Sequence, residues 1–134
     1  MSQISKAIFS ILNASTAVTG LVGSRITPEA RTQSAVLPCI VYAINEDETS
    51  HSLTGAAFRH AKIEILCVGD TAAAASSVHD VARTALQGVA GTFAGVVILH
   101  CLHDKSLSNY QAPMAGETTG AFLYSAIFSI MYQN

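Results

Sequence analysis

The segment from Phe58 to Val68 constrains the fold most strongly, because its hydrophobicity alternates residue by residue. The two alternating sets are Ala61, Ile63, Ile65 and Cys67 on one side and His60, Lys62 and Glu64 on the other. Successive side chains of a strand point to opposite faces of a sheet. The pattern therefore predicts a strand with one face packed on an apolar layer and the other face beginning in water.

Helical periodicity appears in two other segments. Residues 3 to 14 place apolar side chains at the spacing of one buried helix face. A second helix is predicted from a cap at Asp70 to about Gln87, with a buried stripe of small and branched residues. Between the two, Thr16 is predicted to cap a short turn that ends at Gly23.

The remaining chain is divided into short extended segments and polar loops. Further strands are predicted at residues 25–27, 39–45, 95–103 and 119–132, and loops at residues 29–36, 46–55 and 104–118. The loops at 47–55 and 104–118 are expected to be mobile and are candidates for partner contact. The order of elements predicts one α+β domain over residues 1–134, a mainly antiparallel sheet of four to five strands packed against two helices.

The composition indicates that other subunits cover part of the surface. Half of the residues are hydrophobic and only 12% are charged, against about 25% in an average soluble domain. The most apolar stretch, Gly120 to Tyr132, is shorter than the roughly 20 residues of a membrane-spanning helix, and the N-terminus does not resemble a signal peptide. Because oligomer interfaces are depleted in charge, self-association explains this composition better than a membrane does.

Charge and cysteine content argue against two other classes. The formal net charge is −2 and the sequence has no basic run, so binding to nucleic acid through its phosphates is disfavoured. The three cysteines, Cys39, Cys67 and Cys101, are odd in number and widely spaced. They are interpreted as buried thiols in a reducing cytoplasm, not as a disulfide framework.

One cluster has residue types suited to zinc, namely His100, Cys101, His103 and Asp104. In a strand, His100 faces away from Cys101 and His103, so the ligands do not converge. A catalytic cysteine is disfavoured because each cysteine lies in an apolar strand. We therefore expect no catalytic residue, no metal site and no cofactor.

Several local patterns, taken in order, resemble one family. Leu21, Gly23, Arg25 and Ile26 are followed by the segment 37–42, LPCIVY, and then by the segment 62–67, KIEILC. A helix and a long apolar strand ending in Tyr132 complete the pattern over nearly the whole chain. The chain resembles the tail-terminator, or tail-completion, proteins of long-tailed bacteriophages. It departs from them at Leu66, often polar in the family, and at Val68, often aromatic.

The resemblance implies a virion structural protein and not an enzyme. Such proteins form a ring, typically of six copies, on the head-proximal end of the tail tube. The ring ends tube polymerisation and provides the surface for joining the head. The implied partners are further copies of the chain, the tail tube protein and the head–tail connector, with no membrane. Genome DNA would pass through the ring without sequence-specific binding, and assembly would take place in the cytoplasm of the bacterial host.

Candidate contact residues come from the polar strand face, the acidic run and the long loop. They are Arg25, Glu46, Asp47, Glu48, His60, Lys62, Glu64, Asp104, Lys105, Asn109, Tyr110 and Glu117. Arg25 is expected to hold a carboxylate in two-point geometry. The alternative for the acidic run Glu46–Glu48 is a solvated turn without a partner, and the alternative for the long loop is ordinary disorder. The strand face with His60 either faces solvent or lines the channel of a ring.

Two other functions stay open at this point. The first is a head-completion or connector adaptor protein of the same joint. The second, from another class, is a small ligand-binding or enzymatic α+β domain, which the lack of a converging set of polar residues disfavours.

Overall fold

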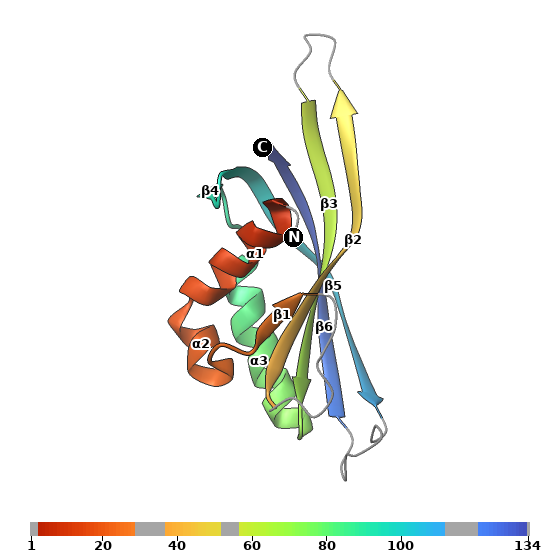
Figure 1. Ribbon diagram of the computed structural model, residues 1–134. Helices are drawn as coiled ribbons and strands as arrows, with labels where there is room; N and C mark the ends of the chain where they lie inside the picture. Colours follow the sequence, from red (N-terminus) through yellow and green to blue (C-terminus); the bar gives the residue numbers. More distant parts are fainter. Residues whose placement is uncertain (1–2, 29–36, 52–56, 112–120, 134) are drawn as a thin grey trace.

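The computed structural model describes residues 3–28, 37–51, 57–111 and 121–133. The elements are, in chain order, α1 (Gln3–Ala14), α2 (Thr16–Val22), β1 (Ile26–Pro28), β2 (Cys39–His51), β3 (Ala57–Gly69), α3 (Ala72–Leu86), β4 (Gly91–Phe93), β5 (Val96–Gln111) and β6 (Ala121–Gln133). All strands belong to one sheet in the order β1-β2-β3-β6-β5-β4. The helices lie together on one face of this long, twisted sheet (Figure 1). The predicted α+β class is confirmed.

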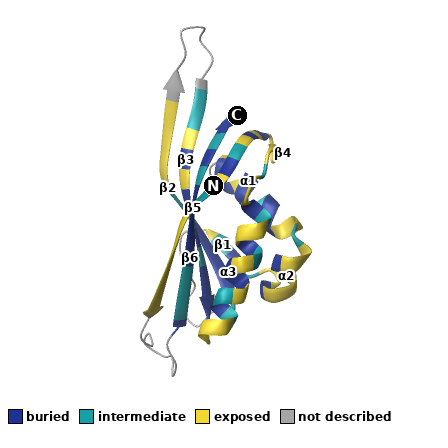
Figure 2. Cartoon of the chain, turned by 180° about the vertical axis from the view of Figure 1, so that it is seen from behind, coloured by how far each residue is buried: buried dark blue, intermediate teal, exposed yellow. Residues whose placement is uncertain are grey.

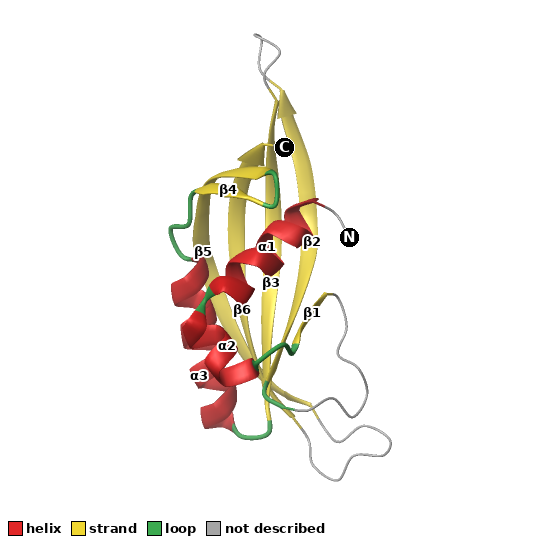
Figure 3. Ribbon diagram, turned by 60° about the vertical axis from the view of Figure 1, so that its left-hand side comes forward, coloured by secondary structure: helices red, strands yellow, loops and turns green. Residues whose placement is uncertain are grey.

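The sheet is antiparallel except for its first pair. β2 pairs with β3, β3 with β6, β6 with β5 and β5 with β4, all antiparallel, whereas β1 pairs with β2 in parallel. Bulges interrupt β2 between Ile44 and Glu46 and β5 at two places, between Ile98 and His100 and between His103 and Lys105. Bulges bend a strand and increase its twist, which accords with the curvature visible in Figure 3.

The core lies between the sheet and the helices. The predicted inner face of β3 is confirmed, since the side chains of Ala61, Ile63, Ile65 and Cys67 are all buried. The buried face of α1 and the stripe of α3 pack against them in one apolar cluster. A second, small cluster of Cys39, Val68 and Ala121 lies outside this core.

Local chemistry determines where the helices begin and end. The side chain of Thr71, not Asp70, caps α3 by accepting a hydrogen bond from the backbone of Ala74 at 3.1 Å. Ser15, not Thr16, caps α2 in the same way. Each prediction was wrong by one residue because an N-cap needs extended dihedrals, which Thr71 and Ser15 have.

Two connections depend on special backbone geometry. Gly69 joins β3 to α3, and a Cβ there would lie 2.6 Å from the backbone nitrogen of Ala75. The loop between β4 and β5 has positive φ at both Ala94 and Gly95, as a two-residue hairpin turn requires. β4 was not predicted from the sequence, because a three-residue strand has too few positions to show alternation.

The strands extend further than predicted. β2 continues through Glu46–Glu48 to His51, and β5 continues through Asp104 to Gln111. The prediction of loops over these residues is wrong. Although their side chains are polar, the backbone of β2 stays paired with β3, and the backbone of β5 stays paired with β6. The rest of the two predicted loops, residues 52–55 and 112–118, and the predicted loop at 29–36 lie outside the described residues.

We predict that Ile65→Asp will yield insoluble protein. Ile65 is fully buried between the sheet and the helices, and an unpaired carboxylate there would be costly to desolvate. The matched control is His60→Asp on the exposed face of the same strand, which should stay soluble. Comparison of the soluble fractions after expression tests this, and a folded, soluble Ile65→Asp protein would contradict the assigned strand faces.

Candidate interaction surfaces

Most of the predicted contact residues lie on the face of the sheet that carries no helix. Direct cross-strand partners share a face, and the register joins Glu48 to His60, Glu46 to Lys62, and Glu64 through Ile127 to Lys105. We call this surface the helix-free face. Its charged residues lie on β2, β3 and β5, and Leu66, Leu107 and Leu123 lie on the same face.

One ion pair lies in the middle of the helix-free face. Lys62 Nζ lies 3.3 Å from Asp104 Oδ2, and Ser129 donates its hydroxyl proton to the same oxygen. The hydrogen bond from Ser129 and the contact with Lys62 hold the pKa of Asp104 below its usual value. These contacts connect the three neighbouring strands β3, β6 and β5 at the bulge of β5.

The acidic run is divided between the two faces of β2. Glu46 and Glu48 lie on the helix-free face, whereas Asp47 pairs with Ala61 and lies on the opposite face. The hydroxyl of Tyr132 lies 2.8 Å from both carboxylate oxygens of Asp47, and Arg59 Nη2 lies 2.9 Å from one of them. Asp47 is therefore held by internal contacts, which sequence reasoning did not foresee.

Tyr132 is the centre of that cluster. Its side chain is fully buried, and the Arg59 guanidinium lies 5.6 Å from its ring centroid. Burial, and then the hydrogen bond to Asp47, raise the pKa of the Tyr132 hydroxyl far above its usual value. The phenol therefore stays protonated and donates to the carboxylate.

Arg25 does not contact a carboxylate among the described residues. Its Nε donates to the carbonyl oxygen of Pro38 at 2.9 Å, and Nη2 lies 3.4 Å from the carbonyl oxygen of Leu21. The expected two-point ion pair with a carboxylate stays a prediction, since the described contacts of Arg25 are to backbone carbonyls. These contacts fasten the end of α2 to the start of β2, which is a structural role.

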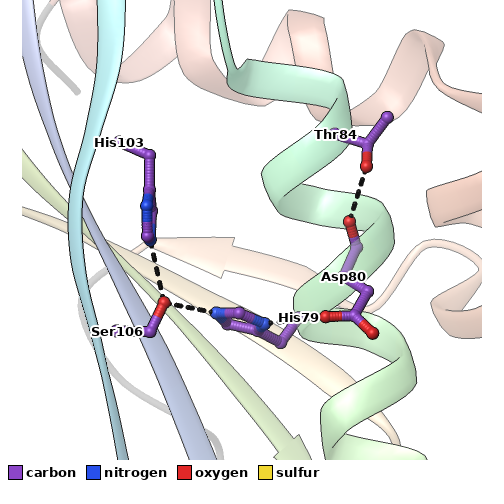
Figure 4. A network of polar contacts seen from close by, with 5 residues as sticks. All are labelled: His79, Asp80, Thr84, His103 and Ser106. Atoms are coloured by element: carbon purple, nitrogen blue, oxygen red, sulfur yellow. Dashed lines mark hydrogen bonds and ion pairs between the residues drawn. The ribbon is translucent and has the colours of Figure 1, made fainter.

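A polar network connects α3 to β5 (Figure 4). The Ser106 hydroxyl lies 2.7 Å from His79 Nε2 and 2.8 Å from His103 Nε2, and His79 Nδ1 lies 3.2 Å from Asp80. When His79 donates Nδ1–H to Asp80, its Nε2 accepts the Ser106 proton, and His103 can then donate to Ser106. The network satisfies the nearly buried His79.

The order Asp80, His79, Ser106 is that of a hydrolase triad, but the geometry favours a structural role. A triad carboxylate is buried and orients the base. The Asp80 side chain is instead 70% exposed, and Asp80 is the residue directly after His79 in the chain. The Ser106 hydroxyl is shared with His103, a second imidazole that a triad does not have. A hollow of about 420 Å³ is lined by His103 and by residues at the C-terminal end of α3, namely Arg83, Thr84 and Gln87.

β5 carries most of the exposed apolar surface. Of the six large hydrophobic side chains that are exposed among the described residues, five lie on β5: Val97, Leu99, Leu102, Leu107 and Tyr110. Leu107 also lines a hollow of about 380 Å³ on the helix-free face, together with Leu66 and Leu123. Exposed apolar side chains gathered on one strand indicate a surface for contact with protein.

The three cysteines are buried free thiols, as predicted. Burial raises the pKa of Cys101 to about 12 and that of Cys67 still further, so these two thiols stay protonated. Within the described ranges, no three His, Cys, Asp or Glu residues lie together in a way that could hold a metal ion. As predicted, His100 faces away from Cys101 and His103, since it pairs with Met131 on the helix-free face.

No described helix is long and apolar enough by itself to cross a membrane. α1 and α2 pass that test only when taken together, and the pair is bent by 86°.

The remaining predicted residues lie on β5 or outside the structure. Asn109 and Tyr110 are exposed near the end of β5, and the Tyr110 ring packs at 5.1 Å on Phe122. Glu117 lies outside the described residues. Sequence reasoning missed His79 and Ser106, because single polar residues within a helix and within an expected loop give no sign that they meet.

Comparison with known proteins gives one result on the fold and another on the family. The fold is similar to a chain of a structure described as "Virion of native gene transfer agent (GTA) particle", with a TM-score of 0.71 and 14% identity. The match covers 96% of this chain and 92% of that chain. At this identity the likeness concerns the fold, an α+β domain found in a virion. No curated protein matches the sequence.

The sequence itself gives the family. Residues 6–119 match the model described as Tail completion protein gp17. The chain belongs to this family, as the sequence resemblance implied, and is therefore a structural tail protein of a phage-like virion.

We predict that Tyr132→Phe will lower the free energy of unfolding by about 1–3 kcal/mol, because the partly buried Asp47 carboxylate loses the phenol as a hydrogen-bond donor. The matched control is Tyr110→Phe, at a residue that is 53% exposed, and it should have no measurable effect. Urea unfolding followed by circular dichroism measures both. Equal stability of Tyr132→Phe and the parent would contradict the role of the Asp47 contact.

A second prediction concerns pH. The lowered pKa of Asp104 adds stability that is present above the pKa of the unfolded chain and disappears as the pH falls through the folded pKa. Ser129→Ala should therefore reduce the stability lost between neutral pH and pH values near the usual carboxyl pKa. Urea midpoints measured across this range test the effect. The control is Ser125→Ala, which changes a buried serine on the same strand and face. Over the same pH range this variant should lose as much stability as the parent protein loses.

Proposed function

We propose that the chain forms a ring on the head-proximal end of the tail tube, where it ends tube polymerisation and provides the surface for joining the head. Family membership supports a role in completing the tail. The observation that carries the ring is the exposed apolar strand β5 in a chain with few charges. Such a surface is expected to be covered in the assembled state.

The mechanism is binding and geometric capping, without catalysis. A ring bound to the last layer of the tube covers the groups to which the next layer would add. Because a ring uses two different patches of each subunit, one on each side, its two ends stay available for the tube and for the connector. The polar contacts of His79, Ser106 and Asp47 hold the fold together in this account.

The helix-free face is suited to line the channel of such a ring. Its described charges include the carboxylates of Glu46, Glu48, Glu64 and Asp104 against the ammonium groups of Lys62 and Lys105. A surface with this excess of carboxylates does not neutralise phosphates, and salt-dependent DNA binding requires such neutralisation. DNA would therefore pass without being held.

Two other surfaces are proposed for the partners at the ends of the ring. The hairpin of β2 and β3 extends past the helices at one end of the sheet, and at the other end β5 ends and β6 begins beside α3 (Figure 1). We propose that one end contacts the tube protein and the other the connector. Assembly would take place in the cytoplasm of the bacterial host.

Deletion of the gene tests the proposal. We expect tails of uncontrolled length that fail to join heads, and restoration of both length and joining when the intact gene is supplied in trans. Tail lengths are measured by electron microscopy of negatively stained lysates. Tails of normal length with defective heads would instead assign the chain to a head-completion or connector adaptor.

A further inference from the structure

We propose that the outer edge of β5 pairs with the outer edge of β2 of a neighbouring copy, so that the sheet continues from subunit to subunit. This inference rests on the ring proposed above, and adds which strands form its contacts. Figure 2 shows the two exposed strand halves at opposite ends of the sheet, in β2 and in β5. A strand edge without a partner is a template for pairing with another chain.

The outer edge of β5 is open over a defined stretch. β4 pairs only with Val96–Ile98. Beyond it, the Cys101 carbonyl accepts from Gly88 at 2.8 Å, and the His103 backbone nitrogen donates to Gln87 at 2.7 Å. The Tyr110 nitrogen donates to the Asn109 side chain at 2.8 Å. Between these contacts, no described residue pairs with the outer edge of residues 105–109.

The outer edge of β2 is open over the complementary stretch. β1 pairs with Ile40–Tyr42 at the beginning of β2. From Ala43 onward, only β3 among the described elements pairs with β2, along its inner edge. The open stretch carries Glu46 and Glu48, both exposed. The two open edges differ in sequence and in place, so their pairing is head-to-tail, as a ring requires.

Strand direction and charge both suit this pairing. Three successive antiparallel pairs separate β2 from β5, so the two strands run in opposite directions within one subunit. A copy rotated about an axis near the strand direction would therefore bring its β2 antiparallel to β5. In the register that we propose, Lys105, which is exposed and forms no ion pair with a described residue, lies opposite Glu48 of the neighbour.

The register that joins Lys105 to Glu48 has a definite stagger. Within one subunit Glu48 lies level with His60, and Lys105 lies level with Glu64, four residues further along β3. That offset is about 14 Å along the strand, and four strands are about 19 Å wide. The resulting strand tilt is roughly 35°, which matches closed barrels.

The same stagger keeps the short strands out of the contact. With Glu48 opposite Lys105, the open residues 43–48 of one copy lie along residues 105–109 of the other. The β1-covered stretch Ile40–Tyr42 then lies beyond Asn109, and the β4-covered stretch Val96–Ile98 lies at the other end. β1 and β4 thus limit each edge to the part that the neighbour uses.

Disulfide trapping in assembled particles tests the pairing. Glu48 and Lys105 of one chain are three strands apart, about 14 Å or more, so they cannot form a disulfide within the chain. The chain with both Glu48→Cys and Lys105→Cys should, after oxidation of purified particles, give a ladder of covalent multimers on non-reducing gels. The native cysteines are buried and do not compete.

The controls determine which contact exists. Glu48→Cys combined with Thr84→Cys, on the exposed side of α3, should give no ladder. Dimers from either single variant would indicate a symmetric contact, and a product that contains the tube protein would indicate another occupant. Either of these last two results would overturn the pairing. The absence of a ladder in particles with tails of normal length would also overturn it, and would leave the ring proposal intact.

Exchange of the two charges provides a second measurement. Lys105→Glu should reduce the yield of joined particles, because it places a carboxylate opposite Glu48 of the neighbour. The added change Glu48→Lys should restore the yield, since the pair then has opposite signs again. Failure of the double exchange to recover any of the loss, with both proteins folded by circular dichroism, would contradict the proposed register.

Discussion

The pairing of β3 with β6 is the constraint on which the rest of the structure depends. The two strands are in register from Arg59 and Tyr132 at one end to Gly69 and Phe122 at the other. Because direct partners share a face, this register places the apolar positions of both strands on the same side. That side gives the three helices a continuous apolar layer to cover.

The charged residues follow from the same register. Once the apolar positions face the helices, the residues between them lie on the helix-free face, where β2 and β5 add further carboxylates and ammonium groups. The bulge in β5 places Asp104 beside Lys62 and Ser129, which belong to different strands. The charged surface on the helix-free face is therefore a consequence of the buried layer.

The edges of the sheet have a different character from its centre. A central strand satisfies its backbone groups within the subunit, whereas an edge strand leaves one side unpaired. In this chain short strands and single side chains cover parts of the edges, through β1, β4, Gln87 and Asn109. The uncovered part of β5 also bears exposed apolar side chains. For a tail-completion protein, these are the features expected of a surface that another subunit covers.

The sequence by itself determined the elements with strong local periodicity. The alternation in β3, the amphipathic face of α1 and the stripe of α3 each report a buried face, because side-chain direction repeats with a fixed period. These signals were sufficient for the α+β class, and the order of soft motifs was sufficient for the family. The extent of β2 and β5 was not predictable, because their outer halves are polar and resemble loops while their backbones are paired.

Only the tertiary structure decided which distant residues meet. His79 and Ser106, or Asp47 and Tyr132, are far apart in the chain, and nothing in their local sequence encodes the contact. The strand order β1-β2-β3-β6-β5-β4 likewise leaves the outer parts of β2 and β5 at opposite edges, although neither is marked as an edge by its composition. Local periodicity specifies which side of an element is buried, but the neighbour of each element depends on the packing of the whole chain.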